Sequence, residues 1–270
     1  MSVSWTEWAV PSYWRERFPW RIFLPVIVFL AVPSLLSAGA SRLAILLLLL
    51  LLVFQFRLWD DLGDVETDRI EFPERVLCRR RSVAPFYWLW LAVAMGVVVL
   101  LWGHRPLLVC YLVTVTAFFL WYRFLAPHAP PVLRYHVVAV KYPIFVYFAA
   151  GLSSESRGPL VVATMALVYL TFVVYEPLHD PRLHRFRGIN VVVGADVALW
   201  TIAAGVTLIL ARGDGTPTSV LSSLALGALA LAIVSYRRFQ READCTNYGR
   251  GIFFLAFVAL LTLHGANLWA

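Results

Sequence analysis

Acidic residues are scarce in this chain, and nearly half of them are concentrated in one short stretch. Of the sixteen, seven lie within fifteen positions: Asp60, Asp61, Asp64, Glu66, Asp68, Glu71 and Glu74. Asp61, Asp64 and Asp68 are three and four residues apart, so a helix of 3.6 residues per turn places them on one face. Three carboxylates on one face repel one another unless a cation lies between them. Mg²⁺ suits such a site because it binds carboxylates and substrate phosphates, and we predict these three aspartates as its ligands.

The alternative for this stretch is a solvated acidic segment whose carboxylates pair with nearby arginines, among them Arg69 and Arg75. We favour the functional interpretation, because the stretch continues an apolar segment at 42–59. Acidic groups at the edge of a membrane usually have a function.

A second acidic pair, Glu176 and Asp180, lies four residues apart at the end of another apolar segment. The same helical spacing places both carboxylates on one face. We predict that they form the second half of a clamp for a metal–diphosphate, with Arg182 contacting the diphosphate. The alternative is a carboxylate pair in a surface loop, capped by Arg182 or Arg185.

Lys141 is the only lysine, and it falls within the apolar segment 133–152. An ammonium at the centre of a membrane helix costs about 2.5–3.5 kcal/mol on insertion scales, so it normally faces a polar cavity. A lysine is a natural phosphate ligand, and we predict that role. Snorkelling to the interface is the alternative. Pro143 is expected to kink the helix.

Two further polar groups lie within predicted spans. Asp196 faces either a cavity or a neighbouring helix, and both alternatives stay open. His136 is more simply explained as a hydrogen-bonded core residue than as a base.

The composition identifies the setting of these residues as a membrane. Of the 270 residues, 61% are apolar and 14% charged, whereas soluble domains average about 45–50% and about 25%. The mean hydropathy is +0.75. One soluble core cannot enclose that much apolar surface. The net charge of +7 comes from arginines between apolar segments, which suits membrane topology and diphosphates better than nucleic acid. The three scattered cysteines indicate neither a disulfide framework nor a zinc site.

A membrane-spanning helix needs about 20 mainly apolar residues, and nine segments meet that requirement. We predict one all-α, polytopic domain over 1–270, with spans at 22–38, 42–59, 84–102, 106–124, 133–152, 160–178, 190–211, 218–235 and 251–269.

The arginines orient these spans. With the amino terminus in the cytoplasm, the inner side holds seventeen arginines: 15, 17, 21, 69, 75, 79, 80, 81, 123, 134, 182, 185, 187, 237, 238, 241 and 250. The outer side holds Arg42, Arg105, Arg157 and Arg212. This positive-inside bias supports an odd number of spans and places both acidic sites near the cytoplasmic face. We expect a bacterial inner membrane.

With its DxxDxxxD run after the second span, its second acidic pair and its nine predicted helices, the chain resembles the UbiA superfamily of intramembrane prenyltransferases. The matching run is Asp60-Asp61-Leu62-Gly63-Asp64-Val65-Glu66-Thr67-Asp68, in which Asp60 replaces the usual Asn. The second signature is reduced to Glu176 and Asp180, without the aspartates that usually follow. Lys141 corresponds to the family's lysine in the fifth helix.

The resemblance implies a nine-helix bundle that ionises a prenyl diphosphate and transfers the prenyl chain to an aromatic or otherwise electron-rich acceptor. It implies Mg²⁺ held by five acidic residues: Asp61, Asp64, Asp68, Glu176 and Asp180. Arg69, Arg75, Lys141 and Arg182 would contact the diphosphate. All five acidic residues and Lys141 then count as catalytic.

Two alternatives accompany this prediction. A membrane terpene cyclase of the same superfamily would convert the prenyl diphosphate alone to a cyclic terpene, and the reduced second motif is compatible with that. A non-enzymatic cation transporter is the third possibility. It is less consistent with a chain that has no internal repeat.

Overall fold

The chain folds into helices. The computed structural model describes residues 9–36, 41–80, 82–153, 158–210 and 218–265, and no strand occurs among them. Arg81, Arg157 and Arg212, which contributed to the orientation count, lie outside these ranges. So do the ends of three predicted spans, at 37–38, 211 and 266–269.

Seven helical segments within the described ranges are long and apolar enough to cross a membrane. They are Arg42–Gly63, Ala84–Leu101, Arg105–His128, Pro131–Leu152, Leu160–His179, Ile189–Ile209 and Thr246–Gly265. An eighth is obtained if the bent pair Val10–Arg17 and Trp20–Leu35 counts as one span. The helix α11 (Thr218–Phe239) covers the predicted span 218–235, but it is not among the seven. The all-helical fold is thus confirmed, and its long apolar helices are compatible with a polytopic membrane protein. The count of nine spans stays a prediction.

The helices divide between two compact units. Unit 1 comprises Met1–Phe29 and Arg42–Arg123, and unit 2 comprises Leu30–Ser41 and Phe124–Ala270. The single domain over 1–270 therefore stays a prediction.

Unit 1 contains α1 (Ala9–Arg17), α3 (Arg42–Gly63), α4 (Val65–Glu71), α5 (Ala84–Leu101) and α6 (Arg105–Leu120). The helix α2 (Trp20–Leu35) begins in this unit. Aromatic rings from α1, from α3 and from the residues between α1 and α2 pack together: Trp14 lies 4.6 Å from Phe18 and 5.0 Å from Phe54, centroid to centroid. The chain bends by 73° between α1 and α2, where Pro19 lacks the N–H that a continuous helix needs. The contact between Trp14 and Phe54 holds α1 against α3.

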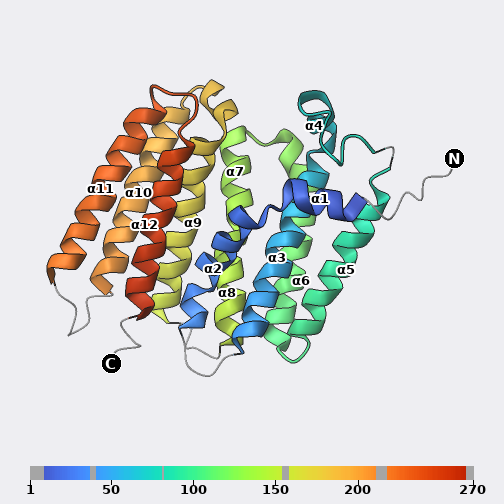
Figure 1. The fold of residues 1–270 in the computed structure, drawn as a ribbon, viewed down its shortest axis with the longest axis horizontal. Coiled ribbons are helices and arrows are strands. Elements are labelled where there is room, and N and C mark those ends of the chain that lie inside the picture. The colour runs from blue at the N-terminus through green and yellow to red at the C-terminus, as the bar shows by residue number, and fades with distance from the viewer. Residues whose placement is uncertain (1–8, 37–40, 81, 154–157, 211–217, 266–270) are drawn as a thin grey trace. The chain divides into compact units, whose positions relative to one another are not determined.

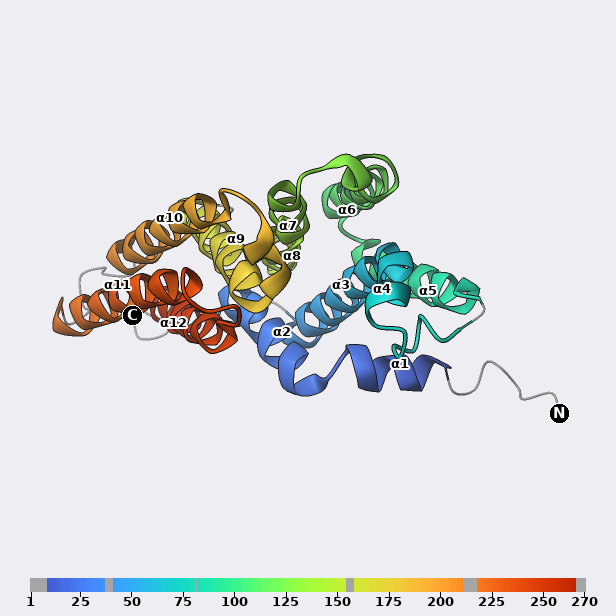
Figure 2. The same cartoon turned by 90° about the horizontal axis from the view of Figure 1, so that it is seen from above.

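Unit 2 contains α7 (Pro131–Ala139), α8 (Lys141–Leu152), α9 (Pro159–His179), α10 (Ile189–Leu210), α11 and α12 (Thr246–Gly265). The helices α9, α10, α11 and α12 lie side by side in Figures 1 and 2, and α9 also packs against α8. At one crossing a Cβ on Gly249 would lie 2.9 Å from the Tyr175 ring, so only glycine permits that approach. Small residues bring membrane helices together in this way.

The predicted fifth span is interrupted. It divides into α7 and α8 at Val140, next to Lys141. Pro143 has no N–H to donate to the carbonyl of Ala139 four residues before it, and its ring crowds that carbonyl. The expected proline distortion therefore takes the form of a break between two helices, and Lys141 becomes the first residue of α8.

Candidate functional site

The first acidic run lies where α3 ends in unit 1, and Asp61 is its most heavily engaged carboxylate. Its Oδ2 accepts hydrogen bonds from the Tyr13 hydroxyl at 2.8 Å and from Arg17 Nε at 3.1 Å. Its Oδ1 accepts a bond from Arg17 Nη2 at 2.5 Å and lies 3.2 Å from Arg57 Nη2. Two guanidinium groups thus neutralise a carboxylate whose side chain is 5% exposed.

A bend at Asp64 separates the helix that carries Asp61 from the helix that carries Asp68. α3 ends at Gly63, Asp64 is the N-cap of α4, and Asp68 lies within α4. Asp61 and Asp68 are buried, whereas Asp64 is exposed. Asp68 accepts a hydrogen bond from Arg75, whose guanidinium lies 3.9 Å above the Phe72 ring. The local helical hydrogen bonds continue through the bend, from Asp64 N to Asp60 O and from Asp68 N to Asp64 O.

Asp60 extends the site towards a distorted turn. The Tyr122 hydroxyl donates to Asp60 Oδ1. Tyr122 belongs to a π-helical turn, Trp121–Leu125, that follows α6. Such turns are rare and occur frequently at functional sites.

The segment after α4 is attached to α1 through Glu16. Both carboxylate oxygens of Glu16 accept from the Val76 backbone N–H, at 3.1 and 3.2 Å. Arg79 Nη2 lies 3.9 Å from the same carboxylate. Glu16, Tyr13 and Arg17 therefore bind α1 to both sides of the acidic run.

Tyr13, Arg17 and Arg57 were missed by sequence reasoning. For Arg57 a signal was present, because residues four apart on a helix are neighbours and Arg57 is followed four positions later by Asp61. Tyr13 and Arg17 are 48 and 44 residues from Asp61, and no local pattern indicates their contact.

The predicted metal ligands are not gathered in this arrangement. Within the described ranges, no three residues of the types His, Cys, Asp or Glu are grouped so that they could hold a metal ion. The carboxylate oxygens are donors that Mg²⁺ takes, but arginines contact Asp61 and Asp68. We therefore derive no chemical step through a metal ion.

The second acidic pair lies in unit 2 at the end of α9. Glu176 is exposed. Asp180 caps the short helix Pro181–Arg185 by accepting from the backbone N–H of Arg182 at 3.0 Å, and the Arg182 side chain donates to both Asp180 oxygens. Burial alone raises the pKa of the Asp180 carboxyl, but these bonds outweigh it and hold that pKa below its ordinary value.

A polar recess of about 550 Å³ lies beside this end of α9. Its lining residues are His179, Glu242, Asp244, Cys245, Thr246, Asn247, Tyr248 and Arg250. Asp244 caps α12 by accepting from the hydroxyl and the backbone N–H of Thr246, at 2.7 and 3.0 Å. These hydrogen bonds lower the pKa of Asp244.

Lys141 is 3% exposed, and its ammonium lies 5.4 Å from the centre of the Tyr142 ring. A buried ammonium at the first residue of α8, beside the break at Val140, does not reach solvent as a snorkelling lysine would. Its phosphate-binding role stays a prediction.

Asp196, 4% exposed within α10, forms a third polar site. The Tyr135 hydroxyl donates to Asp196 Oδ2 at 3.1 Å, and His136 Nε2 lies 3.5 Å from the same oxygen. His136 Nδ1 lies 3.0 Å from the Tyr169 hydroxyl. Asp196 thus contacts the neighbouring helix α7, which was one of the two alternatives predicted for it.

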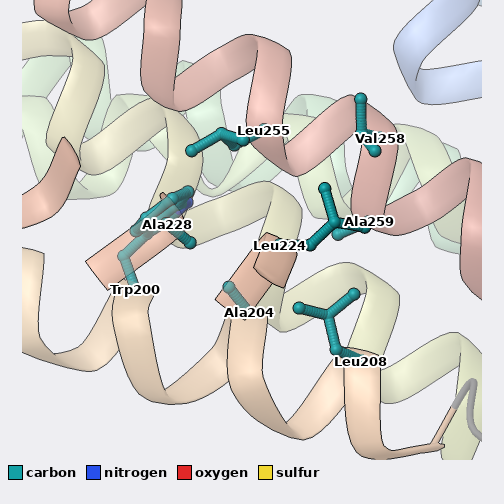
Figure 3. A pocket seen from close by; sticks show the side chains of 8 residues that line it. All are labelled: Trp200, Ala204, Leu208, Leu224, Ala228, Leu255, Val258 and Ala259. Atoms are coloured by element: carbon teal, nitrogen blue, oxygen red, sulfur yellow. The ribbon is translucent and has the colours of Figure 1, made fainter. Parts of the chain in front are cut away.

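The cavity inside the α10–α12 bundle is too small for a substrate. Its volume is about 10 Å³, which is about the space that one water molecule needs. Figure 3 shows the side chains that line it: Trp200, Ala204, Leu208, Leu224, Ala228, Leu255, Val258 and Ala259. These side chains are almost entirely apolar, so this part of unit 2 is packed core.

Comparison of the chain with protein-family models, curated proteins and solved structures finds no match. The resemblance to the UbiA superfamily therefore rests on the residues of the motif and on their position at the end of a membrane helix.

Proposed function

We propose that this protein is an intramembrane prenyltransferase of the UbiA type, which ionises a prenyl diphosphate and transfers the prenyl chain to an electron-rich acceptor. The observation that carries the proposal is the acidic run at the end of the membrane helix α3. There, two buried aspartates, Asp61 and Asp68, lie among the arginines Arg17, Arg57 and Arg75. The site is proposed to face the cytoplasm of a bacterial cell.

The arginines and the aspartates of this cluster both support the proposal. A diphosphate needs several positively charged hydrogen-bond donors, and guanidinium groups bind phosphate oxygens through two parallel bonds. Arg17 and Arg75 are partly buried, with side chains 16% and 24% exposed, so their charge is less screened by water than that of an exposed arginine. Arg69, with 37% exposure, pairs with Glu66 and remains a predicted diphosphate ligand.

The acidic groups orient the arginines. Asp61 accepts hydrogen bonds from Nε and Nη2 of Arg17, and Asp68 accepts one from Arg75. Donors that are already positioned lose little freedom when the leaving diphosphate develops its charge. Mg²⁺ is kept in the proposal as a requirement of the resemblance, to be tested by experiment.

The experiment is a single set of incubations. Purified protein in lipid nanodiscs receives prenyl diphosphates of several lengths, with or without aromatic acceptors and with Mg²⁺ or EDTA. Diphosphate release and organic products are followed. We expect release that depends on Mg²⁺ and a prenylated product that depends on the acceptor.

Two variants sharpen this test. Asp64→Ala, at an exposed position of the motif, removes a predicted Mg²⁺ ligand. It is expected to lower diphosphate release at least about 100-fold, the lower end of the loss when one group that stabilises developing charge is removed. Glu74→Gln, at an exposed carboxylate in the same acidic stretch, is the matched control and is expected to retain release. Equal release by both variants would refute the site.

The alternative enzyme is a membrane terpene cyclase. The observation that favours it is Asp180, whose two oxygens both accept from Arg182. Asp180 is therefore part of a local cap, which agrees with the reduced second motif that the cyclase alternative allows. A cyclic hydrocarbon formed without any acceptor would decide for the cyclase. Absence of diphosphate release from every donor would favour the transporter.

A further inference from the structure

We propose that the helix α1 lies in the polar interface of a membrane, and that exposed arginines on it and beside it bind the headgroups of anionic phospholipids. The lipid-binding surface consists of two adjacent pairs in unit 1, Trp14 with Arg15 on α1 and Trp20 with Arg21 at the start of α2. This inference concerns unit 1 alone. It goes beyond the proposed function, because it assigns a lipid ligand to residues that do not contact the acidic run.

The direction of α1 is that of a helix lying along a membrane surface. α1 runs across the direction of α3 and α5 in Figures 1 and 2, and the chain bends by 73° between α1 and α2. A helix with this direction that contains Arg15, Glu16 and Arg17 has the charge of an interfacial helix. The bend therefore marks the level at which the chain leaves the hydrocarbon.

The exposed side chains beside the bend indicate the same level. Trp20, Ile22 and Leu24 are all exposed at the start of α2. Exposed isoleucine and leucine on a membrane-spanning helix contact lipid chains, whereas tryptophan is enriched at the level of the headgroups. Trp14 is also exposed, and one side of its ring packs against Phe54 of α3. The two tryptophans therefore place α1 and the bend at the headgroup level.

The two arginines of the lipid-binding surface have no carboxylate partner. Arg17 pairs with Asp61, so its charge is neutralised inside unit 1. Arg15 and Arg21 are exposed, and neither forms an ion pair within the part of the chain that the structure describes. The Arg21 guanidinium lies instead 5.8 Å from the centre of the Trp20 ring. The phosphate groups of anionic phospholipids supply the missing negative charge.

The opposite face of α1 contacts the acidic run. Each residue of a helix is turned by about 100° from the one before it, so Arg15 points away from both Tyr13 and Arg17. Those two side chains hydrogen-bond to Asp61. Lipid bound at Arg15 therefore stabilises the helix that contacts Asp61 without touching the acidic run, and it should slow the local opening of α1.

The test measures backbone hydrogen exchange in α1, which reports local opening. The full-length protein is placed in nanodiscs of phosphatidylcholine alone or of an equal mixture with phosphatidylglycerol, without any substrate. One basic residue near an anionic surface contributes about a fivefold change in binding, so two should slow the exchange of α1 about 25-fold in the mixed nanodiscs.

Three double variants assign the effect to the arginines. Arg15→Gln with Arg21→Gln should abolish the slowing. Arg185→Gln with Arg187→Gln, at exposed arginines of unit 2, is the matched control, because it removes the same charge and should keep the slowing. Arg15→Lys with Arg21→Lys keeps the charge and should keep most of the slowing, so the test stays valid even if the first glutamine variant fails to fold.

Three results would overturn the inference. The first is equal exchange of α1 in the two kinds of nanodisc, and the second is slowing that persists in Arg15→Gln with Arg21→Gln. The third comes from inorganic phosphate added to the phosphatidylcholine nanodiscs, which should leave the exchange unchanged. If free phosphate slows the exchange as much as the anionic lipid does, the arginines form an anion site and not a lipid-binding surface.

Discussion

Two buried carboxylates in this protein have partners of different chemistry. Asp61, in unit 1, is contacted by the guanidinium groups of Arg17 and Arg57. Asp196, in unit 2, is contacted by the phenol of Tyr135 and the imidazole of His136. Both side chains are almost fully buried, at 5% and 6% exposure, so burial alone does not distinguish them.

The difference lies in the charge of each partner. A guanidinium is not deprotonated in proteins, so Asp61 lies beside fixed positive charges. A phenol carries no such charge, so Tyr135 holds Asp196 through a hydrogen bond without a fixed charge. The first arrangement suits the binding of an anion, and the second suits contact between helices.

The largest expected effect on stability comes from removing Asp61. Asp61→Ala leaves Arg17 partly buried without its bidentate partner, and breaking a buried pair costs about 3–5 kcal/mol in the free energy of unfolding. Asp64→Ala, at an exposed position, should cost less than about 0.5 kcal/mol. Denaturant unfolding in a mixed micelle measures both. Equal losses would show that the pairing of Asp61 does not contribute to the fold.

Removing the arginine should have a smaller effect than removing the carboxylate. Arg17→Ala leaves Asp61 in contact with Arg57 and Tyr13, so we expect a loss of about 1.5–3 kcal/mol, the value of hydrogen bonds to a charged group. Arg15→Ala, at an exposed position of the same helix, is the control for the same unfolding measurement. A loss as large as that of Asp61→Ala would mean that Arg57 does not compensate.

Removing a partner of Asp196 should lower the free energy of unfolding by a smaller amount than either change at Asp61 or Arg17. Tyr135→Phe removes one interhelical hydrogen bond to Asp196, and such bonds in membranes contribute about 0.6 kcal/mol on average, with a maximum of about 1.7. Thr171→Val removes a comparable bond, which Trp200 Nε1 donates between α10 and α9, and should lower the free energy of unfolding by a similar amount. A loss above about 3 kcal/mol for Tyr135→Phe would place Asp196 in the same class as Asp61.

The smallest expected change in the free energy of unfolding concerns Asp180. Its side chain pairs with Arg182 but is less buried than Asp61 and Asp196, at 19% exposure. Its pKa in the folded protein lies below the ordinary value because Arg182 outweighs the opposing effect of burial. The stabilisation is therefore present at neutral pH and is lost as the pH falls from about 4 through the lower folded pKa. An exposed pair contributes less than about 1 kcal/mol.

The difference in unfolding free energy between wild type and Arg182→Ala, measured at pH 7 and pH 3, checks this sign. The difference should be larger at pH 7. Arg185→Ala, at an exposed arginine of the same segment, should show little difference at either pH. A larger effect of Arg182→Ala at pH 3 would contradict the assignment.

Most of the long helices could be predicted from the sequence, because an apolar run of about 20 residues has the length and composition of a membrane-spanning helix. Most predicted spans match helices to within a few residues, for example 84–102 and α5 (Ala84–Leu101). The segment α1 was not predicted, since its nine residues have no apolar run and its position depends on contacts with α3. The bend at Asp64 was not predicted either, because the spacing of the aspartates suits a continuous helix.

By itself, the sequence determined the long apolar segments, the helical class and the position of both acidic motifs at helix ends, since composition and spacing are local properties. The tertiary structure alone decided which partner each carboxylate has. Tyr13 and Arg17 reach Asp61 across more than 40 residues, and Tyr135 reaches Asp196 across 61. Partners so far apart in the chain meet through helix packing, and no pattern within one helix encodes that contact.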